Sequence, residues 1–186
     1  MNGVTLVELE SCESTQDEAR ERVAERAAGE IVVVRAAAQR AGRGRDGRSW
    51  QDPPGAALLL SIARRGPIQA RVLEGLPLRV ADALLESLEL VAPGARGAIA
   101  WKAPNDLVAR RGGAKVAGIL VDARTVGSVV DPIVVGIGVN VSGDAFDTAD
   151  GRDATSVQQL LGAPVATERL AALVVERVAR LLAADG

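Results

Sequence analysis

The segment over residues 104–123, PNDLVARRGGAKVAGILVDA, most constrains what this chain can fold into. Gly112 and Gly113 supply a turn with positive φ between two short runs of strand-forming residues, which predicts a β-hairpin. A hairpin that interrupts the order of helices and strands argues against a regular βαβ winding. We therefore expect an α/β domain of the α+β kind, with a mixed sheet flanked by helices.

The other expected elements follow from the spacing of apolar and β-branched residues. Strands are expected over residues 4–9, 30–38, 57–63, 98–103 and 131–142, and helices over 14–29, 70–90, a short stretch from 155, and 167–184. Thr15 with Glu18, and Thr155 with Gln158, fit capping boxes at two helix starts. Pro77 predicts a kink or break in the second helix.

Composition and charge exclude several classes of protein. Apolar residues make up 48% and charged residues 25% of the chain, as in ordinary soluble globular proteins. The net charge of −2 argues against nucleic acid held by bulk charge, and no apolar run reaches the length of a membrane span. The N-terminus lacks the pattern of a signal peptide, so we expect a cytoplasmic location. Cys12 is the one cysteine, so no internal disulfide can form.

The chain contains no His, and it contains no Tyr. Acid–base catalysis and metal binding by histidine are therefore excluded, and any chemistry must use Arg, Lys, carboxylates, amides or bound metal ions. Of the 22 basic residues only Lys102 and Lys115 are lysines, and both lie in one short stretch. A Lys retained where Arg is used almost everywhere indicates a need for a compact ammonium group, although chance placement also accounts for two residues.

The segment AGRGRDGRSW over residues 41–50 contains G-x-G-x-x-G, the spacing of a dinucleotide-binding loop. That loop needs a helix opening within it, whereas two prolines and a strand-like run follow here, so we reject this interpretation. In an extended segment Arg43 and Arg45 would project together as donor forks for phosphate or carboxylate. The alternative is a solvated surface loop. Trp50, one of three aromatic residues, favours a ligand pocket, because an indole can form an apolar wall.

With its flanks, QRAGRGRDGRSWQDPPGAALLLS resembles the biotin-binding loop of biotin–protein ligases, roughly Q-x-A-G-R-G-R-x-G-R-x-W-x-S-P-x-G-x-x-L-x-x-S. Three further segments resemble family motifs in the same order: ESCESTQDEA, WKAPNDLVARRGGAKVAGILVDA and VVGIGVNVS. The resemblance implies the class II synthetase-like fold of biotin and lipoate ligases. It also implies ATP-dependent activation of biotin to biotinyl-5′-AMP and transfer to a lysine of a carboxylase's biotin carrier domain, with Mg²⁺ accompanying the ATP.

The resemblance also assigns roles to individual residues. Lys115 and Arg43 would be catalytic, with Lys115 bridging the biotin carboxylate and the α-phosphate. Biotin would be bound by Ser14, Thr15, Gln39, Gly42, Arg43, Gly44, Arg45, Trp50, Lys115 and Gly118. The nucleotide would be bound by Arg45, Trp50, Asn105, Asp106 and Asn140. Asp106 is the candidate metal ligand, although the sequence reveals no full ligand set.

Each assigned residue also has a purely structural interpretation. Ser14 or Thr15 can cap a helix, Trp50 can pack in a core, and Lys115 can be an exposed charge on a hairpin. The Pro-Asn-Asp sequence by itself predicts a turn.

The sequence departs from the family pattern at several points. Ala103 replaces the family's tryptophan, and Trp101, two residues earlier on the same strand face, is expected to fill part of that space. Gln16 stands where Asn is usual. Over residues 1–186 we expect a single biotin–protein ligase-like catalytic domain, with no N-terminal helix-turn-helix and no C-terminal SH3-like barrel.

Two other functions are kept as alternatives. A lipoate or octanoyl ligase-like enzyme would share the fold, but its glycine run near R-R-x-S-G-G-G is absent from this sequence. A non-catalytic protein that holds biotin or biotinyl-adenylate would not release pyrophosphate. The expected partners are biotin, ATP and the carrier domain, with no nucleic acid and no membrane, and a homodimer is left open.

Overall fold

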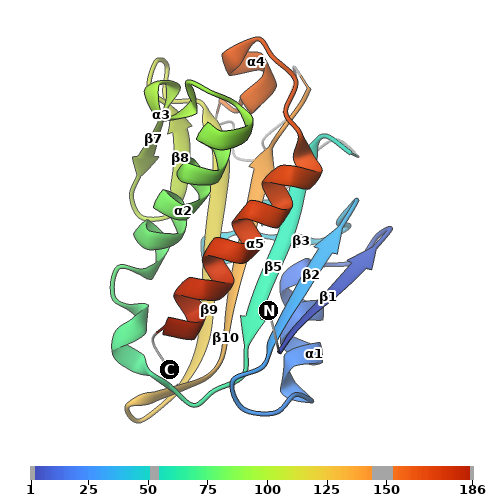
Figure 1. The fold of residues 1–186 in the computed structure, drawn as a ribbon, viewed down its shortest axis with the longest axis vertical. Coiled ribbons are helices and arrows are strands. Elements are labelled where there is room, and N and C mark those ends of the chain that lie inside the picture. The colour runs from blue at the N-terminus through green and yellow to red at the C-terminus, as the bar shows by residue number, and fades with distance from the viewer. Residues whose placement is uncertain (1–2, 51–54, 144–152, 185–186) are drawn as a thin grey trace.

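The computed structural model describes residues 3–50, 55–143 and 153–184 (Figure 1). Within these residues eight strands form one sheet, in which the path β1–β2–β5–β10–β9–β8–β7 is hydrogen-bonded between neighbours and β6 pairs with β10. The strands are β1 (Val4–Leu9), β2 (Ile31–Ala36), β5 (Ala57–Arg64), β6 (Ile68–Gln69), β7 (Ile99–Lys102), β8 (Asp106–Ala109), β9 (Lys115–Val126) and β10 (Val129–Asn140). β1 runs parallel to β2 and the other pairs are antiparallel, so the expected mixed sheet is confirmed.

Helices cover both faces of the sheet. α2 (Leu76–Val91) and α5 (Thr167–Ala184) lie on the face turned to the viewer in Figure 1, and α1 (Thr15–Ala24) lies behind the sheet. The shorter helices are η2 (Ala70–Leu73), α3 (Ala95–Ala98) and α4 (Val157–Leu161). None of the described helices is long and apolar enough to cross a membrane.

The main core lies between the sheet and the pair α2 and α5. The buried residues of α5 recur at helical spacing, as at Leu170, Val174 and Val178, so one apolar stripe of this helix packs on the sheet. A smaller core joins α1 to the other face. Trp101 packs partly buried against the main core, while its expected role in place of a tryptophan at Ala103 stays a prediction.

The Gly/Arg segment forms a second, two-stranded sheet on the α1 face. β3 (Gly42–Arg43) pairs with β4 (Ser49–Trp50) around the 3₁₀ turn η1 (Arg45–Gly47), and we call residues 42–50 the ribbon. The expected extended backbone holds as far as Gly44, and the chain then turns back at Asp46, whose φ is 57°. A strand and not a helix follows the turn, which confirms that this is no dinucleotide-binding loop. The two prolines beyond it lie outside the described residues.

Helix starts differ from the prediction in three places. Ser14, and not Thr15, caps α1, since its Oγ accepts a hydrogen bond from the backbone N–H of Gln16. Ser156 caps α4 in the same manner, one residue later than predicted. Pro77 lies in the first turn of α2, where a missing N–H leaves no helical hydrogen bond unmade, and the helix expected over 70–90 is broken just before it into η2 and α2.

Candidate functional site

A cavity of about 310 Å³ lies between the ribbon and the sheet, on the face that α1 covers. Its walls come from the first turn of α1, the ribbon, and strands β5, β8, β9 and β10. Every residue that the sequence assigned to biotin or nucleotide lines this cavity, with the exception of Gly42. Gly42 is buried in the ribbon, where an added Cβ would come within 2.8 Å of the carbonyl oxygen of Trp50. The structure thus brings together segments that lie far apart in the sequence.

Several lining residues were not assigned from the sequence. Among them are Gln16, Ser61, Gly136 and Gly138. A signal for three of them was present, because Ser61 closes the motif LLLS and the two glycines belong to GIGVN. Strand periodicity places Gly136 and Gly138 on the same face as Asn140, which was assigned. The motifs were matched as wholes, and their small residues were overlooked.

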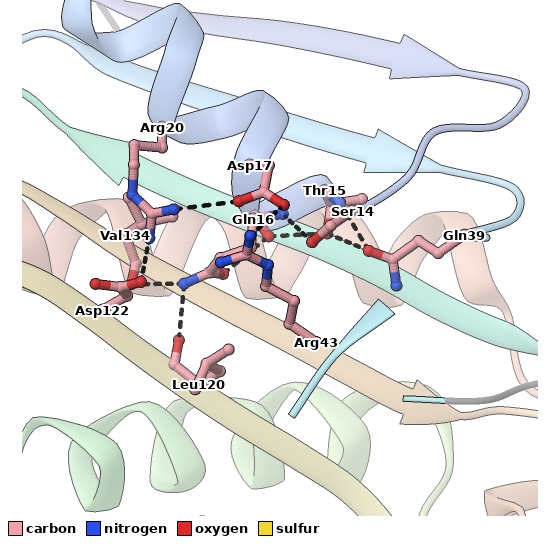
Figure 2. A network of polar contacts seen from close by, with 11 residues as sticks. Ser14, Thr15, Gln16, Asp17, Arg20, Gln39, Arg43, Leu120, Asp122 and Val134 are labelled. Carbon is pink, nitrogen blue, oxygen red and sulfur yellow. Dashed lines mark hydrogen bonds and ion pairs between the residues drawn. The ribbon is translucent and has the colours of Figure 1, made fainter. Parts of the chain in front are cut away.

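A cluster of neutral polar side chains forms one part of the wall (Figure 2). We call Thr15, Gln16, Gln39 and Ser61 the polar cluster. The backbone N–H of Thr15 donates to Oε1 of Gln39 at 2.7 Å, and the hydroxyl of Thr15 lies 2.9 Å from that of Ser61. Thr15, Gln16 and Ser61 are buried. Because no member carries a charge, this wall suits a neutral polar group of a ligand.

Cys12 lies beside the polar cluster, where its backbone forms a bridge with that of Gln39. The thiol is buried, and this burial, followed by the nearby negative charge of Glu18, raises its pKa. A thiol with a raised pKa stays protonated at neutral pH and is a poor nucleophile. Cys12 is not among the described residues that line the cavity.

The indole of Trp50 packs directly on the backbone of the sheet, at a place where two neighbouring glycines have no side chains. Gly118 and Gly138 are direct partners across β9 and β10. A Cβ at Gly138 would lie 2.7 Å from the indole, and one at Gly118 would lie 3.1 Å from it. The Trp50 N–H is buried and meets no acceptor among the described residues. Trp50 is therefore a wall of the cavity and not part of either core.

Lys115 reaches into the cavity from the first residue of β9. Its Nζ lies 2.9 Å from Oδ1 of Asp106 and 5.3 Å from the centre of the Trp50 ring. The Lys115 side chain is 26% exposed, so the interpretation as a solvated hairpin charge is wrong. Lys115 places an ammonium group beside an apolar ring, where water screens its charge less than it would in bulk solvent.

Two asparagines use their amide groups to hold the cavity walls. Nδ2 of Asn140 donates to the carbonyl oxygens of Lys115 and Thr155, at 3.2 and 3.3 Å. Nδ2 of Asn105 donates to the carbonyl oxygen of Ile119 at 3.1 Å. Both residues line the cavity, and their expected contacts with a nucleotide stay predictions.

The ribbon is joined to α1 by a chain of ion pairs (Figure 2). Nη2 of Arg43 lies 3.0 Å from Asp17, which also pairs with Arg20, and Arg20 in turn pairs with Asp122 on β9. Arg45 lines the cavity from the turn of the ribbon. The ion pairs thereby tie the ribbon, which carries Arg43 and Arg45 into the lining of the cavity, to α1 and β9.

Metal ligands are sparse in this site. The described part of the chain contains no group of three or more Cys, Asp or Glu residues that could hold a metal ion. Of the described residues that line the cavity, only Asp106 carries a carboxylate, and that carboxylate pairs with Lys115. A dedicated protein cage for a cation is therefore absent from the described residues, while a single carboxylate suits an ion carried mainly by phosphates and water.

Comparison with known proteins gives a family match and several relatives. Residues 8–140 match the model of the Biotin/lipoate A/B protein ligase family. The bifunctional ligase/repressor BirA of Bacillus spizizenii is 34% identical over 162 residues, which are 86% of this chain and 48% of that protein. The biotin–[acetyl-CoA-carboxylase] ligase of Paracoccus denitrificans is 42% identical over 113 residues, covering 59% of this chain and 44% of the relative. The chain thus spans about half the length of these relatives.

Known structures agree with the fold. The crystal structure of biotin protein ligase from Leishmania major in complex with biotin has a TM-score of 0.80 and 25% identity, and the match covers 98% of this chain and 75% of that one. Biotin protein ligase from Aquifex aeolicus in complex with biotin and ATP has a TM-score of 0.73 and 26% identity, covering 96% and 70% of the two chains. The arrangement of sheet and helices is therefore shared over nearly the whole of this chain.

Proposed function

Because the chain belongs to the Biotin/lipoate A/B protein ligase family, we propose that residues 1–186 form a biotin–protein ligase catalytic domain. It uses ATP to activate biotin to biotinyl-5′-AMP and transfers the biotinyl group to a lysine of a carboxylase's biotin carrier domain. The relatives named as biotin–[acetyl-CoA-carboxylase] ligases support this specificity over that of a lipoate ligase.

The observation that carries the proposal is the order of groups along β10. Gly136 and Gly138 lie on the same face of this strand, two residues and therefore about 7 Å apart. Gln16 of the polar cluster lies against Gly136, and Trp50 lies against Gly138. The ammonium group of Lys115 lies next to Gly118, the partner of Gly138. The cavity thus has a neutral polar wall, an apolar floor and then a cation, which matches biotin's ureido ring, its apolar body and its carboxylate.

The chemistry of the first step follows from this placement. A carboxylate oxygen of biotin attacks the α-phosphorus of ATP, a P–O bond forms, and the bond to the departing pyrophosphate breaks. Lys115 lies where it offsets negative charge that builds on the carboxylate and α-phosphate oxygens, and Arg43 adds a second cation from the ribbon. Holding both reactants in one walled cavity supplies the rest of the acceleration through their orientation.

In the second step the amine of the carrier lysine attacks the acyl carbon of the adenylate. The C–N bond forms, the C–O bond to AMP breaks, and the amine loses a proton. This chain needs no histidine for either step, since both depend on positioning and on neutralising charge.

Mg²⁺ would be held chiefly by the phosphates of ATP, with Asp106 as the candidate protein ligand. When bound, the ion would neutralise charge on the phosphate oxygens. Asp106 fits this role because its carboxylate lies in the cavity beside Lys115. The ion pair with Lys115 would then be rearranged on binding of the nucleotide.

Release of pyrophosphate tests the proposal. The protein is incubated with ATP and Mg²⁺ and with biotin, lipoate, octanoate or no acid. We expect release that depends on biotin and is small with the other acids. Release with lipoate or octanoate in place of biotin would favour the related ligases, and biotin binding without any release would favour a non-catalytic binding protein.

A further inference from the structure

In the polar cluster, the contacts of Gln16 and Ser61 determine which side chain donates and which accepts each hydrogen bond. The amide of Gln16 points Nε2 at two backbone carbonyl oxygens, those of Leu120 and Val134, at 3.5 and 3.4 Å (Figure 2). The flipped amide would place an oxygen against both carbonyls, which is unfavourable. Oε1 of Gln16 therefore faces Ser61 as an acceptor, at 3.3 Å.

The floor of the cavity supports this placement of Gln16. A Cβ at Gly136 would come within 2.3 Å of Oε1 of Gln16, so this amide fills a space that only a glycine leaves open. Gln16 is 3% exposed and Ser61 is fully buried. An acceptor buried to this degree needs a donor, because leaving it unpaired costs on the order of 1–3 kcal/mol.

The single proton of Ser61 must satisfy that acceptor. Ser61 lies near two oxygens, Oε1 of Gln16 and Oγ1 of Thr15. The amide oxygen cannot donate, so Ser61 donates to Gln16 and accepts the hydroxyl proton of Thr15. The Thr15 hydroxyl has a second acceptor within reach, Oε1 of Gln39 at 3.1 Å. That oxygen already accepts the backbone N–H of Thr15 at 2.7 Å, so the nearer oxygen of Ser61, at 2.9 Å, takes the hydroxyl proton.

The chain of hydrogen bonds then runs from Thr15 through Ser61 to Gln16. With its proton directed at Ser61, Thr15 presents oxygen lone pairs to the cavity. Gln39 has its oxygen engaged by Thr15 and is left with its NH₂ group as a donor. The cavity wall therefore offers an acceptor beside a donor, which is complementary to an N–H beside a C=O.

We infer that Ser61 and Gln16 are positioning residues that make Thr15 an obligate acceptor, and so select a ligand head with an N–H donor. The inference rests on the proposed function, in which that head is the cyclic urea of biotin. A dithiolane ring has no N–H and would leave the Thr15 oxygen unpaired. Neither Ser61 nor Gln16 needs to touch the ligand to exert this selection.

A double-mutant cycle, in which the protein is changed at Ser61 and the ligand at a ureido nitrogen, tests the inference. Binding of biotin and of the two biotins methylated at one ureido nitrogen is measured by calorimetry for the 186-residue chain and for Ser61→Ala. Ser87→Ala is the matched control, since Ser87 is an equally buried serine on α2, away from the cavity, whose hydroxyl donates to the carbonyl oxygen of Ala83. In the unchanged protein, one of the methylated ligands should bind at least tenfold more weakly than biotin.

In Ser61→Ala the preference for biotin over that methylated ligand should fall by about tenfold, because the Thr15 proton loses its nearer acceptor and is left with Oε1 of Gln39, which the backbone N–H of Thr15 already occupies. Ser87→Ala should keep the full preference. Gln16→Met, which keeps the length of the side chain and removes the amide, should behave as Ser61→Ala does. A structural defect would weaken all ligands by the same factor and leave the preference unchanged.

An unchanged preference in folded Ser61→Ala and Gln16→Met would overturn the inference while biotin still binds. If Ser61→Ala does not fold, Gln16→Met alone decides the question by the same criterion. Absence of biotin binding by the unchanged protein is a different result, and it would overturn the proposed function itself.

Discussion

Nζ of Lys115 lies 2.9 Å from Oδ1 of Asp106, and both groups line the cavity between the ribbon and the sheet. Asp106 is the one carboxylate among the described residues that line the cavity, so an anionic substrate entering there would compete with it for the ammonium group. In the proposed function the reaction takes place at this pair of residues.

Lys115→Ala should reduce biotin-dependent release of pyrophosphate by about 100- to 1000-fold, because the charge it places at the reacting oxygens is lost. The fold should be kept, since Lys115 belongs to neither of the two apolar clusters that form the cores. Lys102→Ala is the matched control: Lys102 is the other lysine, is exposed on β7, and should keep full activity. Normal pyrophosphate release by Lys115→Ala would remove this residue from the mechanism.

Gly138→Ala should displace the indole of Trp50, because the new Cβ would lie 2.7 Å from it. We expect a shift of the Trp50 fluorescence in a Trp101→Phe background and a loss of biotin binding of about tenfold or more. Gly97→Ala is the control, since its Cβ would meet no atom within 4 Å. The packing of Trp50 on the glycines would be contradicted by unchanged fluorescence and binding in Gly138→Ala.

Asn140→Ala should lower the free energy of unfolding by about 2 kcal/mol, because it removes the donor to the carbonyl oxygen of Thr155 and one of the two donors to the carbonyl oxygen of Lys115, which keeps the backbone N–H of Thr155. Urea unfolding measures this loss. Asn105→Ala removes one such hydrogen bond at a less buried position and should cost less. Equal stability of the two variants would show that Asn140 does not hold Lys115 and Thr155 together.

Biotin should raise the melting temperature of the protein, and biotin with ATP and Mg²⁺ should raise it further. A ligand that binds only the folded state stabilises it by mass action, by about 2.7 kcal/mol at a concentration 100 times its Kd. Lipoate at the same concentration serves as the comparison and should have little effect. Stabilisation by lipoate and not by biotin would assign the cavity to a different acid.

The sequence predicted the fold well where the local pattern matches the final environment. The strand over residues 4–9 and the helix over 167–184 were placed with the correct bounds, because the strand has clear alternation and the helix carries an apolar stripe that packs on the sheet. The first helix was predicted over 14–29 and ends at Ala24, since the good helix formers that follow, Glu25 to Ala28, carry no signal that separates helix from loop. The turn of the ribbon was missed although Asp46-Gly47 is a pair that favours positive φ at both residues, as the structure has it.

The site residues were predicted from family motifs, which explains which of them were found and which were missed. Residues with distinctive side chains, such as Lys115 and Trp50, were assigned and do line the cavity. Gly42 was assigned and does not line it, because its place in the motif reflects close packing within the ribbon. Ser61 and Gln16 were not assigned, since their importance lies in hydrogen bonds between α1, β5 and the sheet, which only the three-dimensional structure brings together.

Attachment of biotin to a carrier lysine tests the central claim most directly. The protein is incubated with biotin, ATP, Mg²⁺ and an isolated biotin carrier domain of a carboxylase, and the intact mass of the carrier domain is followed with time. The account predicts the gain of one biotinyl group, which requires ATP and is lost when the acceptor lysine of the carrier is changed to arginine. A carrier domain that stays unmodified, while an established biotin ligase modifies it in parallel, would contradict the account.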